Sequence, residues 1–317
     1  MATKYSDLQR SKRNEVARYV TGRMQEQIIQ GYRLLLVTEQ IKKDISASAS
    51  DKGEKKVDHE AVEAEVKRFF EIGTSKVIAP DELETGILRG DVAWRGGAAM
   101  NSRVNELLSP AVVSLLRRDM MESVLLGRIF NEEEGEVYGE LDALSKHENP
   151  NIKAAVALSY MLKHDMRDGI ILKRLSNSGQ EELVRKCAAL NPFRNSAVQR
   201  MQAEDNSLKV VYGVAVNSRS LRSVLDRVTW RIYHDENGWV ASLDTTVEEQ
   251  IKRIKMVLPY HPSLTDHSRT MLMNDNDESI RDQVELVDRM YEKVLEQEHR
   301  TKANNNAGTM VFWACSD

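Results

Sequence analysis

The sequence contains little cysteine and no long hydrophobic run, and both scarcities exclude whole classes of protein. Of its 317 residues, only Cys187 and Cys315 are cysteines. They lie far apart, and Cys187 falls inside an amphipathic helical pattern, so we expect two reduced thiols rather than a disulfide framework. The longest clearly apolar runs, such as Leu34 to Val37, are far too short to span a bilayer, and the first residues do not resemble a signal peptide. We therefore expect a soluble, cytoplasmic protein.

Motifs of catalysis and of cofactor binding are also missing. The chain contains no Walker A string, no G-x-G-x-x-G dinucleotide fingerprint and no G-x-S-x-G nucleophile motif. Its seven histidines stand at no metal-motif spacing from a second histidine or a cysteine. The sequence consequently predicts no cofactor, no metal and no small-molecule ligand. An enzyme with an unfamiliar site is the third of three functional hypotheses.

The charges are nearly balanced in total but not along the chain. Residues 194–231 carry seven Arg or Lys and three Asp or Glu, which is a net charge of +4. Residues 232–317 carry nine basic and sixteen acidic residues, which is a net charge of −7. A local excess of positive charge can attract a polyanion, whereas the acidic C-terminal part repels one.

Residues 1–203 are predicted to be a helical region. Apolar residues recur near helical spacing over residues 8–41 and again over 58–73, where Asp58 is an expected N-cap. Residues 46–57 are small and charged without an apolar face, which predicts a flexible linker. The glycine-rich segment 76–103 is expected to be an irregular loop whose backbone could approach a ligand closely.

Two stretches of the helical region resemble each other. Leu144-Ser145 aligns with Leu175-Ser176 at an offset of 31 residues. Asn149-Pro150 and Asn191-Pro192 each suit a helix start, with the asparagine as cap and the proline in the first turn. Two such helix pairs resemble HEAT-like helical repeats, in which each pair buries its apolar face against the next. Two unrelated amphipathic helix pairs would give the same pattern.

Residues 204–275 differ in texture and are predicted to form a small α/β sheet module. Branched and aromatic residues alternate there with polar ones, and Asn237-Gly238 is a hairpin-turn signal. The predicted strands are residues 208–216, 228–234, 239–243 and 269–273. With the helices between them, the order is βαββαβ, the ferredoxin-like arrangement. The predicted fold class is therefore α+β, predominantly α-helical.

The last segment, residues 276–317, is predicted to be a long helix followed by an arm. The helix runs from Asn276 to Arg300, and its apolar face comprises Ile280, Val284, Val287, Tyr291 and Val294. Residues 274–278 lack the glycine and glutamate spacing of an EF-hand, so we interpret them as the acidic cap of this helix. A terminal β segment follows, and its apolar residues Met310, Val311, Phe312 and Trp313 form a predicted partner-binding arm that adds to a sheet edge.

These observations favour a non-catalytic assembly or scaffold protein that acts through protein–protein contacts or self-association, as a subunit of a larger particle. Three features support this hypothesis: missing catalytic motifs, helical-repeat texture, and the linker and arm.

The second hypothesis is a protein that binds RNA or single-stranded DNA through the basic strip 194–231. Arginines beside aromatic residues on a sheet can stack bases and contact phosphates. The predicted site residues are Arg219, Arg222, Arg227, Arg231, Tyr212, Trp230 and Trp239. Alternatively, these arginines form a solvated face or pair with acidic residues of the same chain.

Overall fold

The computed structural model describes residues 2–51, 59–75, 77–89, 92–101, 104–118, 122–131, 137–165, 169–234, 247–293 and 296. Every regular element among these residues is a helix, and none is a strand. The predicted α+β fold class is therefore wrong. No helix in the described ranges combines the length and the apolar character that crossing a bilayer requires.

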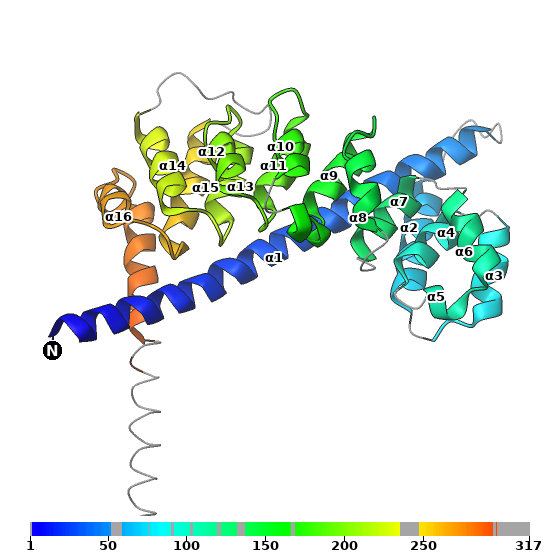
Figure 1. Cartoon of the computed structure of the whole chain (residues 1–317), viewed down its shortest axis with the longest axis horizontal. Helices are drawn as coiled ribbons and strands as arrows, with labels where there is room; N and C mark the ends of the chain where they lie inside the picture. The colour runs from blue at the N-terminus through cyan, green and yellow to red at the C-terminus, as the bar shows by residue number, and fades with distance from the viewer. Residues whose placement is uncertain are drawn as a thin grey trace, which may run out of the picture. The chain divides into compact units, whose positions relative to one another are not determined.

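The chain divides into two compact units. Unit 1 comprises Met1–Glu26 and Gln199–Asp317, and unit 2 comprises Gln27–Val198. Helix α1 (Ala2–Asp51) contributes residues to both units (Figure 1).

The elements of unit 2 after α1 are α2 (His59–Thr74), α3 (Pro80–Leu88), α4 (Val92–Met100), α5 (Val104–Leu107), α6 (Pro110–Arg118), α7 (Glu122–Asn131), α8 (Val137–Leu144), α9 (Pro150–Leu158), the 3-10 helix η1 (Tyr160–Asp165), α10 (Ile170–Leu175) and α11 (Glu182–Leu190). Helix α12 (Ser196–Ala203) leads into unit 1. The further elements of unit 1 are α13 (Leu208–Val216), α14 (Arg222–His234), α15 (Val247–Val257), the 3-10 helix η2 (Leu258–Tyr260), α16 (Asp266–Met273) and a helix over residues 278–293.

Helix α1 buries a stripe of mixed polarity. The buried positions recur every three or four residues, as one face of a helix requires, and they are Ala17, Thr21, Gln25, Ile29, Arg33, Leu36, Val37, Gln40 and Ile41. Because four of these nine side chains are polar, the stripe does not stand out by hydrophobicity. The helix continues to Asp51, so residues 46–51 are not the predicted linker, and residues 52–58 lie outside the described part of the chain.

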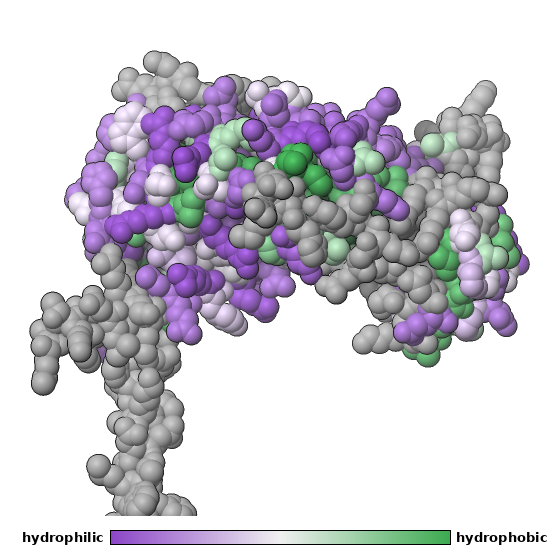
Figure 2. Space-filling view, in the orientation of Figure 1, coloured by the Kyte–Doolittle hydropathy of each residue, from purple (hydrophilic) through white to green (hydrophobic). Residues whose placement is uncertain are grey.

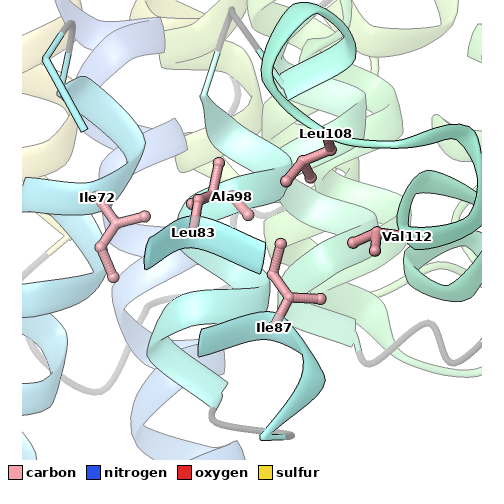
Figure 3. Close-up of a cluster of buried hydrophobic side chains, with 6 residues drawn as sticks. All are labelled: Ile72, Leu83, Ile87, Ala98, Leu108 and Val112. Atoms are coloured by element: carbon pink, nitrogen blue, oxygen red, sulfur yellow. The ribbon is translucent and has the colours of Figure 1, made fainter. Parts of the chain in front are cut away.

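The glycine-rich segment is helical rather than irregular, and its glycines serve helix packing. A Cβ at Gly96 would lie 2.0 Å from Cε2 of Phe69, and one at Gly97 would lie 2.7 Å from Cβ of Ile72. These glycines let α4 approach α2 closely. The adjacent core cluster, drawn in Figure 3, joins α2, α3, α4 and α6 through Ile72, Leu83, Ile87, Ala98, Leu108 and Val112.

Of the two helix N-caps predicted in unit 2, the one at Asn149 is confirmed and the one at Asn191 is wrong. Asn149 is the N-cap of α9, and its side chain accepts a hydrogen bond from the Asn151 amide at 2.9 Å. Asn191 instead ends α11, and its side chain donates to the carbonyl oxygens of Ala157 and Ser159. Helices α9, α10 and α11 pack together. Their HEAT-like character stays a prediction.

In unit 1, the predicted sheet module is wrong. Residues 208–216 form α13, residues 228–234 belong to α14, and residues 269–273 belong to α16. Seven of the nine residues of α13 are buried, so the helix has hardly any polar face that would reveal a helical period. Residues 239–243 lie outside the described ranges.

The last described helix agrees with its prediction over residues 278–293. Ile280, Val284, Val287 and Tyr291 are buried, as their spacing predicts, whereas Val294 and the predicted β arm lie outside the described residues. Asp277 caps this helix, because its Oδ1 accepts hydrogen bonds from the amide and the hydroxyl of Ser279. The face of the protein in Figure 2 is mostly hydrophilic over the described residues, with small hydrophobic patches.

We predict that Gly97→Ala destabilises the protein by about 1–3 kcal/mol, because the added methyl group overpacks the contact between α2 and α4. The control is Gly31→Ala on α1, where an added Cβ meets nothing within 4 Å. The control should gain up to about 1 kcal/mol, because alanine favours a helix over glycine. Denaturant unfolding measures both changes. Equal stability of the two variants would contradict the packing role of Gly97.

A second prediction concerns the cap. Lys252 and Ser279 hydrogen-bond to Asp277 and lower the pKa of its carboxyl group to about 2. A lowered pKa stabilises the folded state at pH values above the unfolded pKa of about 4, and this contribution disappears as pH falls through about 2. Asp277→Asn should therefore lower the melting temperature at pH 6, and the difference from wild type should shrink as pH falls from about 4 toward 2. A difference that is independent of pH would show that the charge contributes nothing.

Candidate functional site

A shallow pocket in unit 1 gathers arginine and serine side chains from three separate segments of the chain. Its volume is about 410 Å³, and its polar lining residues are Arg18, Ser218, Arg219, Ser220, Arg222 and Ser263. We call it the arginine pocket. Leu221 completes the lining, so no carboxylate is present among the described residues that form it.

The turn between α13 and α14 carries most of the arginine pocket, and buried side chains hold it in place. Asn217 is fully buried and accepts a hydrogen bond from the Arg219 amide through Oδ1 at 3.1 Å. The Ser220 amide donates to the Asn217 carbonyl oxygen at 2.9 Å, and the Ser220 hydroxyl donates to the Val214 carbonyl oxygen at 2.7 Å. The turn is therefore closed on itself by its own polar groups.

Three other elements of unit 1 also hydrogen-bond to this turn. Gln25 of α1 accepts from the amide and the hydroxyl of Ser218, at 3.0 and 2.8 Å. Gln199 of α12 accepts from the Leu221 amide at 2.9 Å. His261, after η2, contacts the Asn217 carbonyl oxygen through Nε2 at 2.7 Å. The backbone that presents Arg219 and Arg222 is thus fixed from several sides.

Arg18 reaches the pocket from α1. Ala17, the residue before it, packs in a buried cluster with Val287 and Tyr291 of the helix over residues 278–293. The Thr21 hydroxyl donates to the Ala17 carbonyl oxygen at 2.6 Å and so satisfies its own polar group within the buried stripe. This packing determines where the exposed Arg18 side chain lies.

Two of the three arginines in this pocket have no side-chain partner within the described part of the protein. Among the described residues, neither Arg18 nor Arg222 makes a side-chain hydrogen bond or an ion pair. Arg222 is also the first residue of α14, whose N-terminal end carries partial positive charge. Arg18 and Arg222 therefore bring to the pocket positive charge that no described side chain pairs with.

Several other cations of unit 1 are paired. Arg227 donates to both carboxylate oxygens of Glu204, at 2.6 and 2.9 Å. Arg231 is buried, donates to the Ala203 and Asp205 carbonyl oxygens and lies 3.9 Å from Glu204. Further ion pairs in this unit join Lys252 to Asp277, Arg253 to Glu249, Lys255 to Asp275 and Arg269 to Asp288.

The predicted basic strip is consequently split. Arg219 and Arg222 line the pocket, whereas Arg227 and Arg231 are occupied by intramolecular partners. The Trp230 ring stacks on the His234 ring, with 5.0 Å between the ring centroids. The Arg227 guanidinium lies 4.9 Å from the centroid of the Trp230 ring. Tyr212 is half-buried on α13.

Trp239 and the predicted arm, Met310, Val311, Phe312 and Trp313, lie outside the described residues. Sequence reasoning missed Arg18 and Ser263. No local signal marks them, because they join Arg222 only through the tertiary fold.

A second pocket adjoins the first and shares Arg18, Arg222 and Ser263 with it. We call it the adjoining pocket. Its volume is about 380 Å³, and its apolar lining comes from Ala17, Pro259, Pro262, Leu264 and Tyr291. Asp266 and Arg269 line it as well. The two pockets thus place an apolar surface beside a cluster of positive charge.

The groups in the two pockets are suited to binding rather than to proton transfer. His261 accepts a hydrogen bond from the Ser263 amide through Nδ1 at 3.0 Å, so its Nε2–H donates to the Asn217 carbonyl oxygen. Both ring nitrogens therefore have structural partners. Guanidinium groups stay protonated and are poor general acids, but they bind oxyanions through two parallel hydrogen bonds. The arrangement can bind an anion.

Comparisons of the chain with protein-family models, with curated proteins and with solved structures give no match. The chemistry of the pocket is consequently the basis for functional inference.

The fixed turn leads to a third prediction. Gln25→Ala should destabilise the protein by about 1–3 kcal/mol, because it leaves the amide and the hydroxyl of Ser218 without their acceptor. Gln27→Ala, at an exposed position two residues along α1, should change stability by less than about 0.5 kcal/mol. Thermal unfolding measured by circular dichroism compares the variants. A Gln25→Ala protein as stable as the Gln27→Ala protein would mean that the turn needs no support from α1.

Proposed function

We propose that this protein is a non-catalytic scaffold that binds partner proteins, and that the arginine pocket contacts an acidic group of the partner. The supporting observation is that Arg18 and Arg222 line one pocket without an acidic partner among the described residues, whereas Arg227, Lys252 and Arg269 of the same unit form ion pairs. Exposed like charges in one pocket repel one another in the absence of an anion. An anionic ligand removes that repulsion and gains charge-assisted hydrogen bonds.

Fixed surroundings support a binding role for the pocket. The turn between α13 and α14 is held by Gln25, Gln199 and His261, so the arginine backbones need no rearrangement when a ligand arrives. Pre-organisation of this kind increases affinity, because less conformational entropy is lost on binding. The apolar lining of the adjoining pocket offers contact area for the rest of a polypeptide segment.

A nucleic-acid-binding protein is the second candidate function, and the same arginines favour it. Three exposed arginines, Arg18, Arg219 and Arg222, could contact backbone phosphates. Against it stands the pairing of Arg227 with Glu204 and the burial of Arg231, which interrupt the predicted strip. A protein that neutralises several phosphates of a nucleic acid needs a continuous basic track, and these two residues interrupt the track that the sequence predicts.

The experiment compares binding of labelled ligands by fluorescence anisotropy at low salt. The ligands are degenerate peptides with a central glutamate pair, the same peptides with a glutamine pair, and single-stranded RNA. We expect the glutamate peptides to bind and the glutamine peptides to bind more weakly. The double variant Arg18→Gln, Arg222→Gln should lose about tenfold or more in affinity, since each lost charge-assisted hydrogen bond costs about 1.5–3 kcal/mol.

The matched control is Arg200→Gln, an exposed arginine of α12 that lines neither pocket. Its affinity should stay within about twofold of wild type, which excludes a general charge effect. Glutamate peptides that bind the double variant as well as wild type would contradict the proposal. Tight RNA binding with a steep salt dependence, lost in the double variant, would favour the second candidate instead.

A further inference from the structure

We infer that the arginine pocket recognises a phosphomonoester on a serine or threonine of the partner protein, so that phosphorylation of the partner controls its binding. This inference rests on the proposed function and specifies the acidic group. The inference depends on three arginines that line one cavity, Arg18, Arg219 and Arg222, and on the lack of a carboxylate among the described lining residues.

The charge of the pocket matches a phosphomonoester better than a carboxylate. A carboxylate carries one negative charge, whereas a phosphorylated serine or threonine carries about −1.5 to −2 at pH 7 and offers three acceptor oxygens. Three guanidinium groups carry three positive charges and present many N–H donors in a planar arrangement. Several bidentate contacts to one ligand therefore require the tetrahedral oxygens of a phosphate.

The serines of the pocket contribute in different ways. The Ser218 hydroxyl donates to Gln25 and the Ser220 hydroxyl to the Val214 carbonyl, so both protons are used within the protein. Ser263 makes no side-chain hydrogen bond among the described residues, and it lines both pockets. It can donate a hydrogen bond to a bound oxyanion.

Confinement of the charge favours a single monoester over a chain of phosphodiesters. Beyond the pocket, Arg227 is held by Glu204 at 2.6 Å, Arg231 is buried, and Arg23 pairs with Glu26 at 3.5 Å. Among the described residues, a phosphate that reached Arg23, Arg227 or Arg231 would meet a cation that is already paired or buried, whereas a phosphorylated residue needs one site. The peptide around that residue can use the adjoining pocket, where Ala17, Leu264 and Tyr291 supply apolar surface.

The test uses degenerate octapeptide mixtures that differ only at the central position: phosphoserine, glutamate or serine. Dissociation constants are measured by fluorescence anisotropy for wild type, for Arg18→Gln, Arg222→Gln and for Arg200→Gln. We expect the phosphoserine mixture to bind wild type about tenfold or more tightly than the glutamate mixture. The double variant should lose this preference, and Arg200→Gln should keep it.

A pH series separates a phosphate ligand from other anions. The second pKa of a phosphomonoester is about 6, so phosphoserine binding should weaken about tenfold between pH 7.5 and pH 5 as the dianion takes up a proton. The charged and titratable protein groups around the two pockets are Arg18, Arg219, Arg222, Arg269, His261 and Asp266. The glutamate mixture corrects for them, because its own carboxylate stays ionised over this range.

The outcomes distinguish the two levels of inference. Glutamate peptides that bind as tightly as phosphoserine peptides would overturn the phosphate inference and leave the scaffold proposal intact. Failure of both mixtures would overturn both proposals for this pocket. RNA binding through the same arginines, without phosphopeptide binding, would also overturn this inference. Circular dichroism of the double variant shows whether it is folded. The variant Ser263→Ala provides a second test that removes no charge, and it should weaken phosphoserine binding several-fold.

Discussion

The turns between consecutive helices expose backbone groups that no helix satisfies, and buried side chains supply their partners in this protein. In unit 2, the Asn101 side chain donates to the carbonyl oxygens of Ile72 and Ser75, and Asn191 donates to those of Ala157 and Ser159. In unit 1, Gln25 and Gln199 accept from the turn that follows α13. Short helices can pack closely only if their many ends are paired in this way.

The same constraint explains the composition of α1. A helix that covers the ends of other helices must bring polar side chains to them, so its buried stripe contains Gln25, Arg33 and Gln40 beside apolar residues. Arg33 donates to the Leu158 carbonyl oxygen at 3.0 Å, and Gln40 accepts from the Asn149 side chain at 3.0 Å. These hydrogen bonds require a defined geometry, because a buried amide without a partner costs free energy. The turns that they hold are therefore fixed, and one of these turns presents the arginine pocket.

Sequence patterns predicted the elements whose burial is one-sided. The helix over residues 278–293 buries Ile280, Val284 and Val287 and exposes charged residues between them, so its period was visible. The acidic segment 274–278 was predicted to cap this helix because acidic residues favour a helix start, and Asp277 is the residue that caps it. Helix α13 was taken for a strand because it is rich in valine and buried nearly all round, which removes the helical period.

Close packing between helices also escaped sequence reasoning. The glycines of α4 suggested a loop, since glycine favours irregular backbone, yet Gly96 and Gly97 are required by the side chains of Phe69 and Ile72 on another helix. The site was predictable only where its residues are neighbours in sequence. Arg219 and Arg222 stand three positions apart, whereas Arg18 and Ser263 come from other parts of the chain. Nothing in the sequence indicates that the start of α1 belongs to the same unit as residues from 199 onward.

Charge pairing links the pocket to the stability of unit 1. Glu204 neutralises Arg227, and Asp288 neutralises Arg269, so these cations add to the stability of the folded chain instead of opposing it. Arg18 and Arg222 lack such partners among the described residues, and their mutual repulsion opposes folding until an anion binds. A ligand that binds only the folded state then stabilises it by mass action, and the relief of repulsion is part of its affinity. The repulsion between these arginines therefore lowers the stability of the free protein. In the proposed binding it also favours a doubly charged ligand, since one negative charge would relieve only part of the repulsion.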